Sequence, residues 1–459
     1  MSRLPAGAPI LTAAQMQAAE ARAFAAGVGQ DELMDAAALA VAREAVRLAR
    51  GRVLVLAGPG NNGGDGYAIA RHLAGWDHDV AVAALGRPKD GAAAAMAARW
   101  QGPSMPLAEA GGERPALLID ALFGIGLTRP LEAAVREPLR ALAAEAGAVL
   151  AVDVPSGLAT DSGEDLGAAG ATLTVALGAL KPVHALALER CGTVVLAPIG
   201  LEVESDTRAL ARPVIAAPKP GDHKYRALVS IVAGGMPGAA RLAARAAVGA
   251  GAGYVVLLGD PDPTGPLDAV VHRPVAGLEK TIADGKGALL VGPGLGRDEA
   301  ARERLETALS FGGPMVLDGD ALTSLGREAA EKLRSRAGPT VLTPHSGEFD
   351  RMFGEGGGDK ISRTRAAAET TGATVVHKGH VTVLARADGT TTVAAGASTW
   401  LASAGTGDVL AGAVAARVAA GGDPADALWL HGEAARLAGP AFATDRLAGL
   451  LPRAVEVCR

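Results

Sequence analysis

Aromatic side chains are scarce in this chain: Phe, Trp and Tyr make up only 3% of its 459 residues. Apolar residues nevertheless account for 49% and charged residues for 20%, which is typical of a packed globular protein and excludes a disordered one. The hydrophobic cores must therefore be built from Ala, Val and Leu, whose small side chains let elements pack closely. The length is too great for one ordinary core and predicts two or three domains.

Cysteine is scarce, and an excess of positive charge and long apolar runs are absent. The only cysteines, Cys191 and Cys458, form no metal-binding spacing and favour a reducing compartment. A net charge of −5 without a basic stripe excludes the usual footprint of a nucleic-acid-binding protein. The longest uncharged stretches are too short to span a membrane, and the first ten residues lack the apolar segment of a signal peptide. We expect a cytoplasmic protein that binds neither nucleic acid nor membranes.

The first half alternates apolar strands with glycine-containing loops and helices. A predicted strand over 52–57 runs into a glycine-rich loop over 58–66, and a helix is expected from Tyr67. Further strands are predicted near 80–83, 116–120 and 149–153, each followed by polar or glycine residues. This order predicts a parallel α/β sheet, whose ligand site lies at the carboxyl ends of the strands.

The second half restarts the same pattern after a proline-rich segment, which we take as the domain boundary. Apolar strands are again followed by glycine and polar residues, Asp388-Gly389 predicts a hairpin, and a glycine turn at Gly405 precedes a helix expected over 409–420. No sequence repeat relates the two halves. We predict a first domain over 1–205, a linker over 206–222 and a second domain over 223–459.

The loop Gly405-Thr406-Gly407-Asp408 is typical of a phosphate-binding turn. Its glycines permit close backbone approach, and the following helix offers unpaired N–H groups and a positive dipole end to an anion. Asp408 would then accept the proton of a hydroxyl that is being phosphorylated. The alternative is that Asp408 only caps the helix. No Walker A motif is present, so the chain is not a P-loop enzyme.

The loop Asn61-Asn62-Gly63-Gly64-Asp65-Gly66 does not fit the G-x-G-x-x-G fingerprint of dinucleotide-binding folds. Its amide and carboxylate oxygens suit a hard cation and ribose or phosphate contacts. Asp120, Asp153 and Ser156 add oxygens at neighbouring strand ends. The alternative is a plain glycine-rich helix entry.

The second half resembles the ADP-dependent NAD(P)H-hydrate dehydratases of the ribokinase superfamily, over about residues 214–451. The segments that carry the resemblance are Gly405–Asp408, Lys378–Thr382, Pro344–Glu348, Gly292–Gly296 and Lys219–Lys224. Gly319 stands where that family usually has Ala. The resemblance implies a nucleotide site at Lys378, Gly379, His380, Val381, Thr382 and Gly407. It also implies a substrate site at Ala239, Gly296, His345 and Asp408, with Asp408 catalytic.

The first half resembles the NAD(P)H-hydrate epimerases, over about residues 10–201. Ala38 and Asp35 stand where that family usually has Gly and Glu. The resemblance implies potassium ligands at Asn62, Asp120 and Ser156, and Asp153 as general acid and base. It implies substrate contacts at Asn61, Asn62, Gly63, Gly64, Asp65, Gly124, Ile125, Gly126, Leu127, Thr128, Arg129, Pro130 and Asp153.

Together the two resemblances imply an α/β protein with an N-terminal Rossmann-like αβα epimerase domain and a C-terminal ribokinase-like αβα domain. Such a protein repairs hydrated NADH and NADPH (NADHX and NADPHX), using K⁺, Mg²⁺ and ADP as phosphoryl donor. We also expect a homo-oligomer. The alternative is a vitamin-precursor kinase of the same superfamily with a non-catalytic N-terminal nucleotide-binding module.

Overall fold

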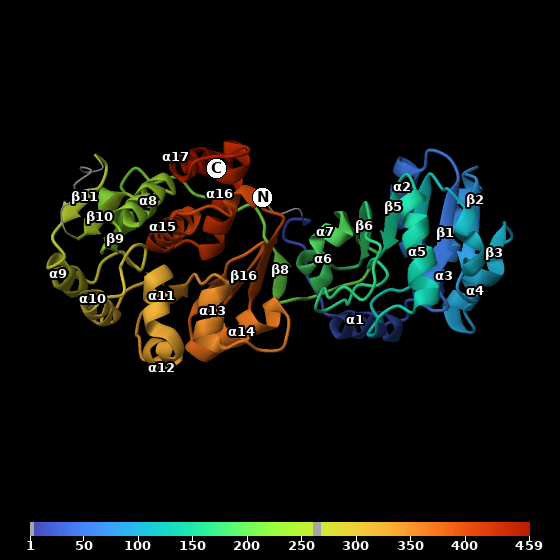
Figure 1. The fold of residues 1–459 in the computed structure, drawn as a ribbon, viewed down its shortest axis with the longest axis horizontal. Helices are drawn as coiled ribbons and strands as arrows, with labels where there is room; N and C mark the ends of the chain where they lie inside the picture. Colours follow the sequence, from blue (N-terminus) through green and yellow to red (C-terminus); the bar gives the residue numbers. More distant parts are fainter. Residues whose placement is uncertain (1–3, 260–267) are drawn as a thin grey trace. The chain divides into compact units, whose positions relative to one another are not determined.

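The computed structural model describes residues 4–259 and 268–459. The chain forms two compact units that divide between Ala209 and Leu210 (Figure 1). Within the predicted linker 206–222, residues 207–209 form a short strand, and both Leu210 and Ile215 are buried. In the parts of the chain that the structure describes, no helix has both the length and the apolar content that a bilayer crossing demands.

The N-terminal unit is built on a seven-stranded sheet with the order β3-β2-β1-β4-β5-β6-β7. All of its strand pairs are parallel, which confirms the predicted sheet type. The strands are β1 (Val53–Ala57), β2 (Val80–Ala84), β3 (Ser104–Pro106), β4 (Leu117–Ala121), β5 (Val149–Val152), β6 (Leu173–Leu177) and β7 (Thr193–Ala197), with β8 (Thr207–Ala209) after them. The helices are α1 (Ala13–Ala25), α2 (Gln30–Leu48), α3 (Asn61–Gly75), α4 (Gly91–Arg99), η1 (Leu107–Gly112), α5 (Ala133–Glu145), α6 (Pro182–Leu186) and α7 (Leu188–Cys191).

Helices cover both faces of this sheet, which explains why its strands are apolar without alternation. In β1, Val53 and Val55 pack with α2, α3 and α4, whereas Leu54 and Leu56 pack with α5 and η1. Successive side chains of a strand point to opposite faces, so a strand covered on both sides needs apolar residues throughout. The order of the sheet reverses between β1 and β4, and this switch point is where doubly wound folds bind ligands.

Helix α3 begins at Asn61, so the expectation of a loop through Gly66 and a helix from Tyr67 was wrong. The first turn packs too closely for side chains at two positions. A Cβ at Gly63 would lie 1.8 Å from the carbonyl oxygen of Gly58, and one at Gly64 would lie 2.7 Å from Cα of Ala93. The glycines of this motif therefore serve backbone packing, while Asn61, Asn62 and Asp65 are presented from a helix N-terminus.

The sheet of the C-terminal unit runs in the order β11-β10-β9-β12-β13-β14-β15-β16-β17. It is parallel except at β15-β16-β17, where the predicted hairpin around Asp388-Gly389 is confirmed. The strands are β9 (Leu228–Val232), β10 (Tyr254–Leu258), β11 (Val271–Arg273), β12 (Ala288–Val291), β13 (Met315–Leu317), β14 (Thr340–Leu342), β15 (Thr374–His377), β16 (Val381–Ala385) and β17 (Thr391–Ala395).

Helices again form two layers on this sheet. Those on one face are α8 (Pro237–Gly249), α15 (Thr406–Ala419), α16 (Pro424–Ala438) and α17 (Thr444–Val457). The other face is covered by α9 (Gly277–Asp284), α10 (Glu299–Leu309), α11 (Gly319–Leu325), α12 (Ala329–Arg334), α13 (Ser346–Phe353) and α14 (Lys360–Thr371). Single turns of 3₁₀-helix lie at η2 (Lys224–Ala227), η3 (Gly326–Glu328) and η4 (Thr399–Leu401).

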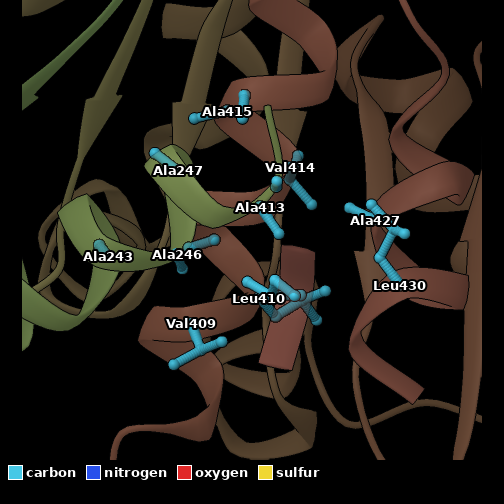
Figure 2. Packing of buried hydrophobic residues seen from close by; sticks show 14 of the residues in the cluster. Ala243, Ala246, Ala247, Val409, Leu410, Ala413, Val414, Ala415, Ala427 and Leu430 are labelled. Atoms are coloured by element: carbon cyan, nitrogen blue, oxygen red, sulfur yellow. The ribbon is translucent and has the colours of Figure 1, made fainter. Parts of the chain in front are cut away.

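Alanine makes the packing of α8 against α15 unusually close. Figure 2 shows Ala243, Ala246 and Ala247 of α8 among the buried side chains of α15. Gly412 of α15 is the tightest point, because a Cβ there would lie 2.1 Å from the carbonyl oxygen of Ala243. This contact fixes the position of α15, whose first turn carries Gly407 and Asp408.

We predict that Gly412→Ala destabilises the C-terminal unit. The new methyl group forces α8 and α15 apart, and overpacking of this kind costs roughly 1–3 kcal/mol. Hydrogen exchange measured by mass spectrometry resolves peptides of both helices, and we expect faster exchange there than in the native chain.

Gly449→Ala is the matched control, because Gly449 is an exposed residue of α17 and a Cβ there would meet nothing within 4 Å. This change removes a poor helix former and should stabilise the unit by up to about 1 kcal/mol. Unchanged exchange in Gly412→Ala would contradict the close-packing account.

Candidate active sites

A cavity of about 590 Å³ opens in the N-terminal unit beside the switch point of its sheet. Its wall includes Glu20 of α1, Asp153 at the end of β5 and Lys181 before α6. Most predicted substrate contacts lie in this wall, namely Asn61, Asn62, Asp65, Gly124, Ile125, Gly126, Leu127, Thr128, Arg129 and Asp153. Gly63, Gly64 and Pro130 are not among its lining residues, nor are the predicted cation ligands Asp120 and Ser156.

Asp120 and Ser156 form one hydrogen-bonded group beneath this cavity. The Ser156 hydroxyl donates to Asp120 Oδ1 at 2.6 Å, and the Ser156 amide donates to Asp120 Oδ2 at 2.8 Å. Ser156 Oγ accepts from the Phe123 amide at 2.9 Å, which joins this group to the Gly124 loop. The missing Cβ of Gly124 would lie 3.4 Å from Asn62 Oδ1, so the third predicted ligand is adjacent.

The chemistry of this group fits a hard monovalent cation. Burial raises the pKa of Asp120, and no cationic side chain pairs with it in the described chain. Asn62 Nδ2 is buried without a hydrogen-bond partner among the described residues. The available ligands are oxygens with a single carboxylate, which suits a cation of low charge. Across residues 4–259 and 268–459, no three His, Cys, Asp or Glu side chains converge as a metal site.

Asp153 is held rigidly in a backbone conformation that few non-glycine residues adopt, with φ at 61°. Its Oδ1 accepts from Lys181 Nζ at 2.5 Å and from the Leu177 amide at 3.0 Å. Its carbonyl oxygen accepts from His184 Nε2 at 2.7 Å, while His184 Nδ1 accepts from the Lys181 amide at 2.9 Å. Burial lowers the pKa of His184 to about 4, so this ring is neutral and acts as a fixed bridge.

The cavity concentrates negative charge around one buried cation. Burial, followed by the charge of Asp153, raises the pKa of Glu20 and raises that of Asp65 well above its usual range. Lys181 is fully buried and forms an ion pair with Asp153. The site therefore combines the Asp153–Lys181 ion pair with two carboxyl groups, Glu20 and Asp65, whose pKa values are raised, which is an arrangement suited to proton transfer.

Lys378 is the centre of the C-terminal site. Its Nζ donates to Asp318 Oδ1 at 2.6 Å, and the Thr343 hydroxyl donates to the same oxygen at 2.7 Å. The Lys378 amide donates to the Pro344 carbonyl oxygen at 2.8 Å. A Cβ at Gly407 would lie 3.3 Å from Lys378 Nζ. Lys378 thus links the carboxyl ends of β13, β14 and β15 to the first turn of α15.

Helix α15 begins at Thr406, earlier than the predicted start near residue 409. Gly405 precedes it with φ at 86°, a left-handed conformation that favours glycine. Among the described residues no side chain caps this helix, so the capping role considered for Asp408 is not observed. Burial, then the charge of Asp318, raises the pKa of Asp408 to about 6. The uncapped N–H groups remain available to an anion.

The other predicted substrate residues contact neighbouring loops of the C-terminal unit. The Gly296 amide donates to Asp320 Oδ2 at 3.0 Å, and a Cβ at Gly294 would lie 3.2 Å from that of Ala239. His345 caps α13, because its Nδ1 accepts from the amides of Gly347 and Glu348 at 3.0 and 3.3 Å. His345 thus has the structural role of a turn residue, and its side chain is exposed.

Residues 378–380 form the tight turn between β15 and β16, and the hydroxyl of Thr382, in β16, donates to the Gly379 carbonyl oxygen at 3.2 Å. Sequence reasoning missed a second lysine beside this turn. Lys360, the first residue of α14, donates from Nζ to the Lys378 carbonyl oxygen at 2.9 Å. It also missed Lys181, His184 and Glu20 in the N-terminal unit. The one available signal was at Lys181, which directly follows the uncharged stretch 166–180.

Comparison with known proteins assigns a family to each half. The model described as NAD(P)H-hydrate dehydratase matches residues 229–456, and the model described as YjeF-related protein N-terminus matches residues 30–183. The bifunctional NAD(P)H-hydrate repair enzyme Nnr of Mycobacterium tuberculosis (strain ATCC 25618 / H37Rv) is 38% identical over 382 residues, covering 81% of this chain and 79% of that protein. The enzyme of the same name from Salinibacter ruber is 33% identical, covering 91% and 89%.

Among solved structures, the ADP/ATP-dependent NAD(P)H-hydrate dehydratase from Bacillus subtilis, co-crystallised with ATP/Mg²⁺, is 27% identical. It covers 54% of this chain and 95% of that one, with a TM-score of 0.48. The two curated relatives span both units, in the same order along the chain as the two family models. The chain therefore belongs to the family of bifunctional NAD(P)H-hydrate repair enzymes.

Proposed function

We propose that the chain repairs hydrated NADH and NADPH in two steps. The N-terminal unit interconverts the R and S forms of the hydrate, and the C-terminal unit dehydrates the S form with ADP, giving AMP and phosphate. The observation that carries this proposal is Asp408, a half-buried carboxyl group at the uncapped N-terminus of α15, whose pKa the charge of Lys378 lowers and burial raises. That arrangement suits transfer of a phosphoryl group to a hydroxyl, and the family gives the hydroxyl its identity.

In the C-terminal unit, the substrate hydroxyl attacks the terminal phosphorus of ADP while Asp408 accepts the hydroxyl proton. The bond from that phosphorus to the bridging oxygen breaks, and AMP leaves. Backbone N–H groups of Gly407 and Asp408 stabilise the charge on the transferring group. The ring nitrogen then expels phosphate in place of hydroxide, and loss of a ring proton restores the reduced nicotinamide.

Magnesium bound to the nucleotide would neutralise phosphate charge during this transfer. The surroundings of Asp408 fit such a cation. The charges of Asp318, Asp320 and Glu348 all add to burial in raising the pKa of Asp408. Two of these carboxylates are already bonded within the protein, Asp318 to Lys378 and Asp320 to Arg297. The third, Glu348, lies 3.4 Å from His345 Nε2, so Asp408 is the carboxyl group of this set that has no ion pair among the described residues.

In the N-terminal unit, Asp153 acts as the general acid and base. It donates a proton to the substrate hydroxyl, so that the ring nitrogen can expel water. Water then attacks the resulting iminium from either face. Asp153 accepts the proton of the attacking water. Lys181 and His184 hold Asp153 in position from below the cavity. Asn62, Asp120 and Ser156 would hold potassium, which would organise the Gly124 loop and bind substrate phosphate.

The cellular setting also belongs to this proposal. Cys191 and Cys458 are both buried free thiols, which suits the reducing cytoplasm. The homo-oligomer expected above stays a prediction, which light scattering on the full chain would test.

The function is tested by adding ADP and magnesium to the full chain with chemically prepared hydrate, and following the absorbance of reduced nicotinamide. We expect the absorbance to recover with one AMP formed for each NADH. Asp408→Asn should slow this reaction by roughly 10²–10⁴-fold, because it removes the proton acceptor without changing shape. In the native chain, kcat/KM should rise with pH through about 6, where Asp408 ionises.

Asp423→Asn is the matched control, since Asp423 caps α16 and pairs with Arg386 away from the site. It should leave the rate and its pH profile unchanged. The rival kinase would instead give no absorbance recovery and a stable phosphorylated product from another alcohol. That outcome would refute the repair function of the C-terminal unit.

Asp153→Asn should abolish epimerisation while sparing the dehydratase. The reaction is best followed in the Asp408→Asn background, where the S form is not consumed, by chromatography of hydrate that starts as the R form. We expect the rate above the uncatalysed one to fall by roughly 10²–10⁴-fold. Asp79→Asn, on the surface of the same unit, is the control. An epimerisation rate that does not respond to Asp153→Asn would leave the N-terminal unit as a non-catalytic module.

A further inference from the structure

We propose that Lys360 is a further phosphate-binding residue of the C-terminal site, whose ammonium group contacts the phosphates of the nucleoside diphosphate bound at Lys378–Thr382. This inference rests on the proposed function of that segment as the nucleotide site. It adds a residue from α14, outside the segments that carry the family resemblance.

The first observation is where the Lys360 ammonium group lies. Its Nζ donates to the Lys378 carbonyl oxygen at 2.9 Å. A Cβ on Gly379 would lie 2.7 Å from the same nitrogen, so the amine rests directly against the Cα of that glycine. The group thus packs on the first peptide of the nucleotide turn, at the carboxyl end of β15. It lies on the edge of the sheet that also carries Asp318 and Pro344.

The second observation is that Lys360 forms no ion pair with any residue that the structure describes. Lys378 is neutralised by Asp318, and Arg363 of α14 by Asp350 of α13. No carboxylate within the described ranges lies at ion-pair distance from Lys360. Two of its three N–H donors have no partner in that part of the chain. A half-buried cation in this state is unfavourable on its own and is completed by an anion that arrives from solution.

The electrostatic consequence agrees with this geometry. Burial lowers the pKa of Lys360 to about 8. The neighbouring ring of His377 stays neutral, because burial and then the charge of Lys360 lower its pKa to about 3. An anion beside Lys360 favours the protonated amine, so phosphate binding raises its pKa. Affinity for ADP should therefore be greatest below pH 8 and should fall as pH rises through about 8.

A purely structural role is the alternative. In that case Lys360 only ties α14 to the Lys378 carbonyl and contributes nothing to phosphate recognition. Adenosine separates the two readings, because it offers the same base and ribose to the turn but carries no phosphate. A change that disturbs the turn weakens adenosine and ADP alike, whereas loss of a phosphate contact weakens ADP alone.

The test is calorimetric titration of the full chain with ADP and with adenosine, in magnesium, between about pH 7.5 and 9.5, where the phosphates of ADP are fully ionised. Lys360→Met keeps the length of the side chain and removes its charge. We expect ADP affinity at pH 7.5 to fall by roughly tenfold to a hundredfold, the range of one charge-assisted hydrogen bond. Adenosine affinity should not change, and the pH dependence of ADP binding should disappear.

Lys360→Arg keeps the charge at every pH in this range, so it should retain most of the ADP affinity and also lose the pH dependence. Lys280→Met is the matched control, because Lys280 lies on α9 and pairs with Asp284. Equal weakening of adenosine and ADP in Lys360→Met, or unchanged ADP binding, would overturn the inference. Failure of the native chain to bind ADP at all would overturn the proposed function as well, which keeps the two claims distinguishable.

Discussion

The ion pair between Lys378 and Asp318 is the interaction on which the C-terminal site depends. It joins the ends of β13 and β15, and Lys378 also lies against Gly407 at the start of α15. Both side chains are largely buried, so removing either one would leave an unpaired charge at a cost of roughly 3–5 kcal/mol. The pair also sets the electrostatics of Asp408, because the charge of Asp318 adds to burial in raising the pKa of Asp408 to about 6, while the charge of Lys378 lowers it.

The N-terminal site also contains an ion pair between a lysine and an aspartate. Lys181 and Asp153 form a buried pair at the end of β5, and the remaining carboxyl groups of the cavity, Glu20 and Asp65, have raised pKa values. In both units a lysine forms an ion pair with one carboxylate, while burial raises the pKa of another carboxyl group. The two sites are built independently, each from strand ends of its own parallel sheet. This independence agrees with the comparisons, in which one family model matches the N-terminal unit and another matches the C-terminal unit.

Much of this architecture could be predicted from sequence, because short apolar strands that end in glycine and polar residues are typical of parallel α/β sheets. The sheet type, the hairpin at Asp388-Gly389 and the convergence of Asp120 with Ser156 follow from that pattern. Helix starts were less predictable. Asn61–Gly66 and Thr406–Asp408 have the composition of loops but begin helices. The first packs tightly against Gly58, and Gly405, directly before the second, packs against Leu242 of α8.

Residues that act through distant partners could not be found in the same way. Lys181 meets Asp153 across 28 residues, and Lys360 meets the Lys378 carbonyl across 18 residues. Neither lysine belongs to a motif, and burial alone distinguishes both from the surface lysines. Glu20 lies on an amphipathic helix where nothing in the sequence separates it from a solvated residue. These groups became visible only once the strand ends were placed in space.

The central claim is that phosphorylation is a transient step that turns a poor leaving group into a good one. Its most direct test is the fate of the substrate's hydroxyl oxygen. With hydrate labelled with ¹⁸O at that hydroxyl, mass spectrometry of a single turnover with ADP should find the label in inorganic phosphate, because the carbon–oxygen bond breaks after the oxygen has joined phosphorus. Label released as water, with unlabelled phosphate formed alongside, would contradict the account.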